Sequence, residues 1–371
     1  MRIWLCVMLV LMHIGVSKAE TLESGLTQVL GQMDLSPLEE ASETQDLGGI
    51  LRDLARGELI WDTAQVLDTM KEAALGEMRL TLKSMPGLIA PALLCALTGL
   101  LHGKNNSVAH LAENAAFLGL AAIMASDLKA YLFQAEHAVT RMNEVMQALF
   151  PLLLMLLAAV GATHGAALFQ PAISAASGTM TTLVRSVSLP LCMGVAVITL
   201  LDSLSGNIRL KRLAMLLRSI ATWTLGIAFT VFIGVTAIQG LTTGVADGVS
   251  IRAAKYAVDH FVPVVGGMFA DTMDTLVGCS LMIKNALGVT GLMLLLSVAG
   301  MPMLRTICSA LMYRACSALL QPVAQERVAG TLHSFSDVLT LLFAIQLSVG
   351  AMFLLLVAQL LAVGNITVTL R

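Results

Sequence analysis

Long apolar stretches alternate with short polar ones over most of this 371-residue chain. A membrane crossing needs about 20 mostly apolar residues, because a helix rises about 1.5 Å per residue and the hydrocarbon core is about 30 Å thick. The pattern therefore predicts an all-α fold, a polytopic bundle of transmembrane helices. Its candidate spans are 86–101, 108–126, 148–168, 187–205, 217–241, 276–304 and 338–363.

The first two of these stretches are the weakest. Pro86 and Pro91 interrupt 86–101, and Glu113 lies within 108–126. One of the two is expected not to cross, and the pair can instead form a re-entrant or half-buried hairpin. This leaves about six full crossings plus re-entrant or amphipathic elements. Charged and apolar residues alternate with helical spacing over 127–147, which predicts an amphipathic helix at the membrane interface or between helices.

The N-terminus is typical of an export signal. Arg2 precedes an apolar core, and Ser17-Lys18-Ala19 offers a small-x-small cleavage site, so residues 1–19 are predicted to be a signal peptide. An uncleaved anchor is the alternative, and it also exports residue 20 onward. Residues 20–85 are acidic and polar, and they are expected to form two or three short amphipathic helices outside the cytoplasm. The membrane domain then covers 86–371.

Composition supports a membrane protein and limits the chemistry. Hydrophobic residues make up 57% of the chain and charged residues 12%, with a mean hydropathy of +0.83, whereas soluble proteins carry about 25% charged residues. The lipid bilayer is therefore the first expected partner. The six cysteines lack metal-ligand spacing, and no hydrolase, phosphate-binding or dinucleotide motif occurs. We expect no enzyme activity, catalytic residue, metal, cofactor or nucleic-acid binding.

Clusters of basic residues predict the orientation. Arg209, Lys211, Arg212 and Arg218 follow one span, and a second group lies between 305 and 327. Because basic residues concentrate on the cytoplasmic side, both regions are expected in the cytoplasm. Residues 242–275 and the C-terminal tail then fall on the exported side.

The exported segment 242–275 is unusually polar for its position between two spans. Gly244 and Gly248 are expected to end the preceding helix, a new helix is expected to start near Ser250, and a third short helix to follow Gly267. The segment is either a solvated amphipathic hairpin over the membrane or a vestibule or docking surface of a transport complex. Its candidate pore or partner-contact residues are Asp247, Arg252, Lys255, Asp259, Asp271 and Asp274.

Three more polar residues lie within or at the edge of spans. Lys284 and Asn285 lie inside 276–304, and a lysine in hydrocarbon costs about 2.5–3.5 kcal/mol unless it faces protein or water, or extends to the interface. Asp202 lies late in its own span. It is either an interface residue near Arg209 or a partner for Lys284 within the membrane.

The segment around 220–300 resembles the stage III sporulation protein AE family of endospore-forming bacteria. The residues that carry the resemblance are Gln239–Gly244, Ala253–Tyr256, Phe261–Gly266, Asp271–Asp274, Gly278–Ser280 and Lys284-Asn285. The overall plan of signal, acidic exported region and repeated spans agrees over essentially the whole chain.

The resemblance implies a subunit of the channel-like secretion complex that joins mother cell and forespore and is required for forespore development. It implies other stage III A sporulation proteins and the stage II sporulation protein Q complex as partners across the intermembrane space. The location it implies is the mother-cell membrane around the forespore, the outer forespore membrane. The alternative is a stand-alone ion-coupled transporter that uses Asp202, Lys284 and Glu113. The third possibility is an intramembrane hydrolase that uses Asp271 and Asp274.

Overall fold

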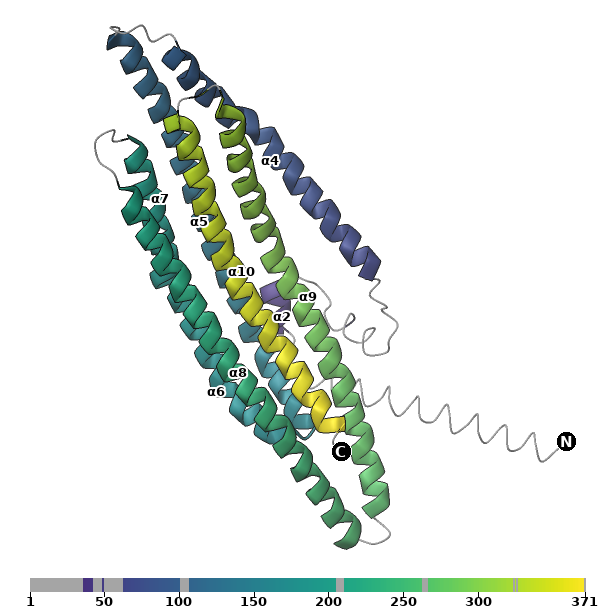
Figure 1. The fold of residues 1–371 in the computed structure, drawn as a ribbon. Coiled ribbons are helices and arrows are strands. Elements are labelled where there is room, and N and C mark those ends of the chain that lie inside the picture. The colour runs from purple at the N-terminus through teal and green to yellow at the C-terminus, as the bar shows by residue number, and fades with distance from the viewer. Residues whose placement is uncertain are drawn as a thin grey trace, which may run out of the picture.

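The computed structural model describes residues 36–42, 49, 63–100, 107–204, 210–261, 266–322, 324 and 326–369, without the side chains of 240–276 and some others. Every regular element within these ranges is a helix (Figure 1). The helix α6 continues through one π-helical turn, η1, into α7. The elements are α2 (Ser36–Ser42), α4 (Thr63–Leu100), α5 (Ser107–Ala159), α6 (Thr163–Leu183), η1 (Val184–Ser188), α7 (Leu189–Leu204), α8 (Lys211–Phe261), α9 (Gly266–Leu320) and α10 (Glu326–Thr369).

Six helices are long and apolar enough to cross a membrane, which confirms the predicted all-α, multi-span fold. The prediction reached six crossings by expecting one of the stretches 86–101 and 108–126 not to cross, and the structure reaches six for a different reason. Both weak stretches lie on helices that meet the length and composition requirement. The count falls from seven to six because 108–126, 127–147 and the first part of 148–168 join in one helix, α5, of 53 residues.

Residues 127–147 are therefore the middle of a long helix and not a separate interfacial element. Their predicted apolar face is correct: Ala135, Val139, Met142 and Met146 are at most 1% exposed. This face packs in the bundle because α9 and α10 lie against α5. The chain turns instead at Gly161, whose φ of 97° favours glycine. The predicted span 148–168 is thus split between α5 and α6.

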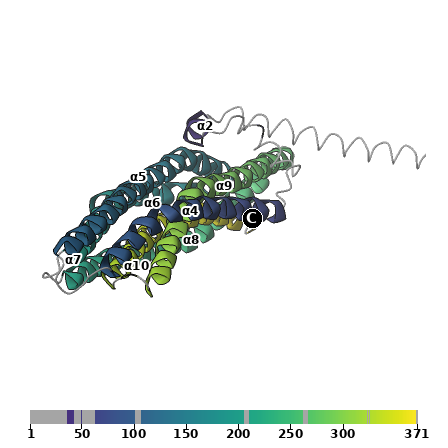
Figure 2. The same ribbon diagram turned by 90° about the horizontal axis from the view of Figure 1, so that it is seen from above.

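The N-terminal region also runs on into the bundle. The helix α2 begins at Ser36, and its Leu38 is fully buried. The helix α2 packs against α5 at the edge of the bundle (Figure 2). By contrast, α4 passes through position 85 without a break and contains both Pro86 and Pro91. Helices of a membrane bundle tolerate internal proline when neighbouring helices, here α5 and α9, support the backbone.

The predicted breaks around 242–250 are wrong. The helix α8 continues to Phe261 through Gly244, Gly248 and Ser250, and α9 begins at Gly266 and continues to Leu320. A glycine costs a helix only about 1 kcal/mol, which is too little to end one of this length. The end of α8 and the start of α9 extend beyond the end of α10 (Figure 1).

The helix α10 lies at the centre of the bundle, in contact with α5, α7, α8 and α9. One face of α10 is buried along its length: the residues Val338, Leu342, Ile345, Val349, Met352, Leu356 and Leu360 are at most 2% exposed. The opposite face is also apolar, with Leu347 and Leu355 exposed by 48% and 38%, as expected for a helix that lipid can solvate.

Successive long helices run in opposite directions. The ends of α4, α7 and α9 and the starts of α5, α8 and α10 lie at one end of the bundle (Figure 1). Lys211 and Arg327 lie in the first turns of α8 and α10 at this end, and Arg314 lies six residues before the end of α9. The arrangement is compatible with the predicted cytoplasmic position of the basic regions, and the orientation itself stays a prediction.

Candidate functional site

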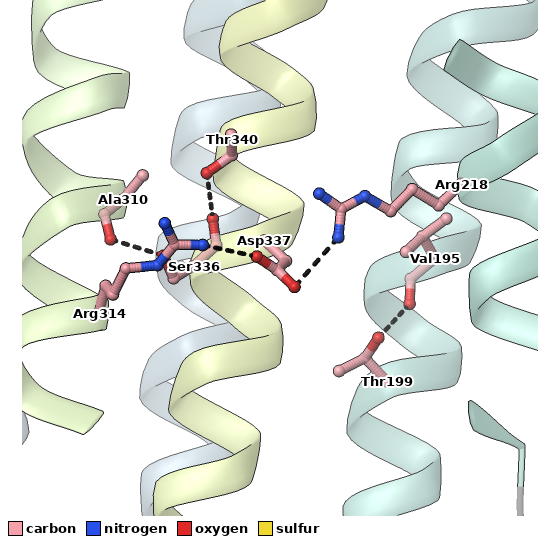
Figure 3. Close-up of polar contacts among 8 residues, drawn as sticks. All are labelled: Val195, Thr199, Arg218, Ala310, Arg314, Ser336, Asp337 and Thr340. Atoms are coloured by element: carbon pink, nitrogen blue, oxygen red, sulfur yellow. Dashed lines mark hydrogen bonds and ion pairs between the residues drawn. The ribbon is translucent and has the colours of Figure 1, made fainter. Parts of the chain in front are cut away.

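Three of the central helices meet at a charged cluster around Asp337. Asp337 on α10 accepts contacts from Arg218 on α8 at 3.0 Å and from Arg314 on α9 at 2.9 Å (Figure 3). Ser336, the neighbouring residue, donates to the carbonyl oxygen of Ala310 on α9 at 2.7 Å. The Asp337 carboxylate thus connects α10 to one arginine on α8 and one on α9. Because two arginines meet one carboxylate, the cluster keeps a net positive charge.

A polar groove of about 620 Å³ lies beside this cluster, between α7, α8 and α10. Ten of its 15 lining residues are polar or charged, and the other five are Val195, Ala214, Met215, Gly330 and Val338. The polar lining residues are Thr199, Asp202, Ser203, Lys211, Arg218, Glu326, Arg327, Thr331, Ser334 and Asp337.

Arg327 lies at the end of the bundle where α7 ends and α10 begins, and it also lines the groove. Its guanidinium donates to the carbonyl oxygens of Ser203 and Leu204 at 2.6 and 3.2 Å, and to the side-chain oxygen of Asn114 at 3.1 Å. It also lies 4.2 Å from the centre of the Phe117 ring, a distance suited to a cation–π contact. Arg327 therefore connects the starts of α5 and α10 with the end of α7.

A second cavity, of about 1210 Å³, lies between α4, α5 and α9. It contains carboxylates, arginines and hydroxyls. The Tyr131 and Ser309 hydroxyls lie 2.5 Å apart, Tyr313 donates to Asp127 at 2.5 Å, and Arg305 lies 3.8 Å from Glu77. In the described part of the chain no three His, Cys, Asp or Glu side chains gather in a way that could hold a metal ion.

Lys284 is buried inside the bundle, with 1% of its surface exposed. Its ammonium group donates to the carbonyl oxygens of Leu361 and Leu360 on α10 at 2.9 and 3.5 Å. These carbonyls are its hydrogen-bond partners among the described residues. The side-chain oxygen of Asn285 is also buried and has no hydrogen bond. Among the predicted alternatives for Lys284, the structure thus favours a side chain that faces protein over one that extends to the membrane interface.

Asp202 does not pair with Lys284. Its carboxylate accepts a hydrogen bond from the backbone N–H of Leu210 at 2.5 Å, at the connection between α7 and α8. Along α10, the Arg327–Ser203 contact and the Lys284–Leu361 contact are 34 residues apart, or about 50 Å. The interpretation of Asp202 as an interface residue is the one compatible with this position.

The charged residues of 242–275 all lie on helices. Asp247, Arg252, Lys255 and Asp259 belong to α8, and Asp271 and Asp274 to α9. Their side chains lie outside what the structure describes, so their roles in a pore or partner contact stay predictions.

Asp337 and its two arginines were not among the candidate site residues. Arg218 and Arg314 were interpreted only as signals of orientation, because each looks like an ordinary cytoplasmic charge in the sequence. The available signal was Asp337 itself, a lone carboxylate that directly precedes a long charge-free stretch, 338–370. Such an acid at the edge of a span needs a cationic partner.

Comparison with known proteins gives one consistent result. The model of the family described as "Stage III sporulation protein AE" matches residues 45–364. A curated relative from Bacillus subtilis (strain 168), "Stage III sporulation protein AE", is 29% identical over 325 residues, which cover 87% of this chain and 82% of the relative. No solved structure matches. The chain therefore belongs to the stage III sporulation protein AE family.

Proposed function

We propose that this protein is a membrane subunit of the channel or secretion complex between mother cell and forespore, and that forespore development requires it. Its role is structural or permease-like, without catalysis. Family membership supports a role in sporulation, and the six long apolar helices support a multi-pass position in a membrane.

The observation that carries the proposal is the length of the helices. The helices α5, α8 and α9 contain 53, 51 and 55 residues, which correspond to about 80 Å each, whereas the hydrocarbon core is about 30 Å thick. Parts of these helices must therefore lie outside the bilayer. A subunit of a larger complex needs such parts to contact its partners.

We further propose the location and the partners. The protein lies in the mother-cell membrane that surrounds the forespore, the outer forespore membrane. The projecting segment 242–275 then faces the intermembrane space, where other stage III A sporulation proteins and the stage II sporulation protein Q complex can bind it.

The alternative, a stand-alone ion-coupled transporter, has less support. It uses a pair of opposite charges inside the membrane, and Asp202 and Lys284 were the expected pair. These residues bind separate backbone groups, at levels of the bundle that lie about 50 Å apart. The geometry thus favours the subunit over the transporter.

Deletion of the gene in an endospore-forming host tests the proposal. We expect development to stop after engulfment, and the full-length chain supplied from a second locus should restore it. A normal spore yield from the clean deletion would contradict the proposed function.

A further inference from the structure

The large cavity between α4, α5 and α9 is polar at a level of the bundle where α10 is apolar. Ten of its 20 lining residues are polar or charged, and its volume is about 1210 Å³. Its ionisable lining residues other than Tyr131 are Glu77, Asp127, His137, Arg141 and Arg305. Their depth in the bundle decides what the cavity can hold, because a charge inside a membrane needs water or a polar partner.

Contacts with α10 give the depth of the inner end of the cavity. A β-carbon on Gly350 of α10 would lie 3.7 Å from the β-carbon of Ala299 on α9 and 3.7 Å from the sulfur of Met142 on α5. These three residues are therefore level with one another. Gly350 lies in the middle of 338–363, the apolar stretch of α10, so Met142 and Ala299 lie at the middle of the membrane crossing by α10.

The cavity reaches this level. Its lining residues Arg141 and Val298 directly precede Met142 and Ala299 in the sequence, which places them within about 1.5 Å of the same level. From Val298 the lining follows α9 to Met312, 14 residues further on, which corresponds to about 21 Å of helix. The inner end of the cavity is thus at the depth of the membrane centre.

The other end of the cavity lies outside the apolar stretch of α10. Met312 lines it there together with Ser84 of α4, whose hydroxyl lies 3.6 Å from the Met312 sulfur. Ala310, two residues earlier on α9, accepts a hydrogen bond from Ser336, which lies two residues before the stretch 338–363. The cavity therefore extends from the edge of the apolar stretch to its middle.

The charge of the lining changes along this path. Both lining carboxylates have partners: Asp127 accepts a hydrogen bond from Tyr313, and Glu77 lies 3.8 Å from Arg305. The ionisable lining residues nearest to the level of Met142 are His137 and Arg141, one helical turn apart on α5. A guanidinium group binds carboxylate, phosphate or sulfonate oxygens through charge-assisted hydrogen bonds. The inner end is thus suited to an anion.

We propose that this cavity is filled with water and that a small hydrophilic anion, such as inorganic phosphate, binds at its inner end beside His137 and Arg141. The volume holds about 40 water molecules, since each takes about 30 Å³ in the liquid. Arg305, whose side chain is 58% exposed, needs such water because lipid does not solvate a guanidinium group. The inference rests on the crossing of the membrane by α5, α9 and α10, and not on the proposed role in a complex.

Thiol labelling tests whether the cavity holds water. The full chain in phosphatidylcholine nanodiscs carries Val298→Cys at the inner end. The matched control is Leu347→Cys on α10, which lies three residues from Gly350, is 48% exposed and does not line the cavity. Methanethiosulfonate reagents attack thiolates, which form in water and not in lipid, so Val298→Cys should be labelled at least about tenfold faster. Mass spectrometry assigns the label to each position, and denaturing detergent should make both thiols reactive. Equal rates in the nanodiscs would overturn the proposal.

The charge preference of the labelling tests the anion. An anionic sulfonatoethyl reagent should label Val298→Cys faster than a cationic trimethylammonium reagent, after each rate is divided by the rate with free glutathione. The preference should disappear when His137→Gln and Arg141→Gln are added, and it should remain with Arg141→Lys, which keeps the charge. A preference that persists in the chain with both glutamines would overturn the anion site.

Protection by phosphate needs no change of the two basic residues, so it does not depend on the folding of those variants. Inorganic phosphate at constant ionic strength should slow the labelling of Val298→Cys by a neutral methanethiosulfonate and leave Leu347→Cys unaffected. Phosphate without effect would contradict the anion site. Protection by anionic lipid in nanodiscs without phosphate would assign the site to a lipid headgroup and contradict a soluble anion.

Discussion

At the scale of single residues, Lys284 shows how a buried charge is held in this bundle. Its ammonium group contacts two carbonyl oxygens of α10, at Leu360 and Leu361. Both residues lie inside α10, which continues to Thr369, so these carbonyls also accept backbone hydrogen bonds of the helix. Removal of the lysine therefore leaves no acceptor unsatisfied.

We expect Lys284→Met to stabilise the protein by about 1–4 kcal/mol, because it removes a buried charge that no carboxylate among the described side chains balances and keeps the volume filled. Lys284→Ala is the control. It removes the same charge but leaves a cavity, so it should be less stable than Lys284→Met. Thermal unfolding in detergent measures both. A marked loss of stability in Lys284→Met would show that the carbonyl contacts outweigh the desolvation cost.

Gly291 is a residue at which only the packing explains the sequence. A β-carbon at this position on α9 would lie 2.3 Å from Leu149, which is fully buried on α5. We expect Gly291→Ala to destabilise the protein by about 1–3 kcal/mol, because the fully buried Leu149 would have to shift within the packed core.

Gly300, on the same helix, is the matched control. A β-carbon there has nothing within 4 Å, so Gly300→Ala should be neutral or stabilise by up to about 1 kcal/mol through helix propensity. Thermal unfolding compares the two variants. Equal effects would mean that α9 and α5 do not approach as closely as the structure places them.

At the scale of elements, the turn between α5 and α6 depends on one glycine. Gly161 has a φ of 97°, and its N–H bonds to the carbonyl oxygen of Ala158 at 2.9 Å. A side chain in this conformation costs about 1–2 kcal/mol. Gly161→Ala should therefore lower stability by this amount, as measured by thermal unfolding, whereas Gly178→Ala within α6 should not, since a β-carbon there meets nothing within 4 Å.

The contacts of α8, α9 and α10 depend partly on Asp337. Asp337→Asn removes the negative charge between Arg218 and Arg314 and should cost about 1 kcal/mol, a modest value because all three side chains are 30–50% exposed. Arg218→Gln or Arg314→Gln should each cost less, because one ion pair remains. Unfolding at low and high salt checks the cause: salt should reduce the difference from the unaltered protein. A difference that is insensitive to salt would indicate that packing and not charge is responsible.

At the scale of the whole molecule, the alternation of helix directions predicts a simple topology. Reporter fusions test this topology. Positions 103, 208 and 323 fall between successive helices at the end of the bundle where α8 and α10 begin. Positions 161 and 263 fall between successive helices at the other end. We expect the first three to report the cytoplasm and the last two the exported side, because basic residues favour the cytoplasm. A cytoplasmic signal at 161 would show that α5 and α6 form a re-entrant hairpin instead of two crossings.

The sequence by itself determined the class of the protein and the residues that face the core. Apolar composition and the 338–363 stretch predicted a membrane bundle, and the helical spacing within 127–147 predicted the buried face of α5. These features are local: each follows from the need to keep polar backbone out of lipid and from the 3.6-residue period of a helix.

Only the tertiary structure decided where helices end and which polar residues meet. Glycine and proline signals predicted breaks near 86 and 242–250, yet α4 and α8 continue through them. The cost of one glycine is small beside the backbone hydrogen bonds of a long helix, and neighbouring helices support an internal proline. Likewise, Asp337 meets Arg218 and Arg314, and Asp202 lies far from Lys284, because packing brings together residues that are distant in sequence. Local pattern carries no information on these distances, so the sequence could not determine them.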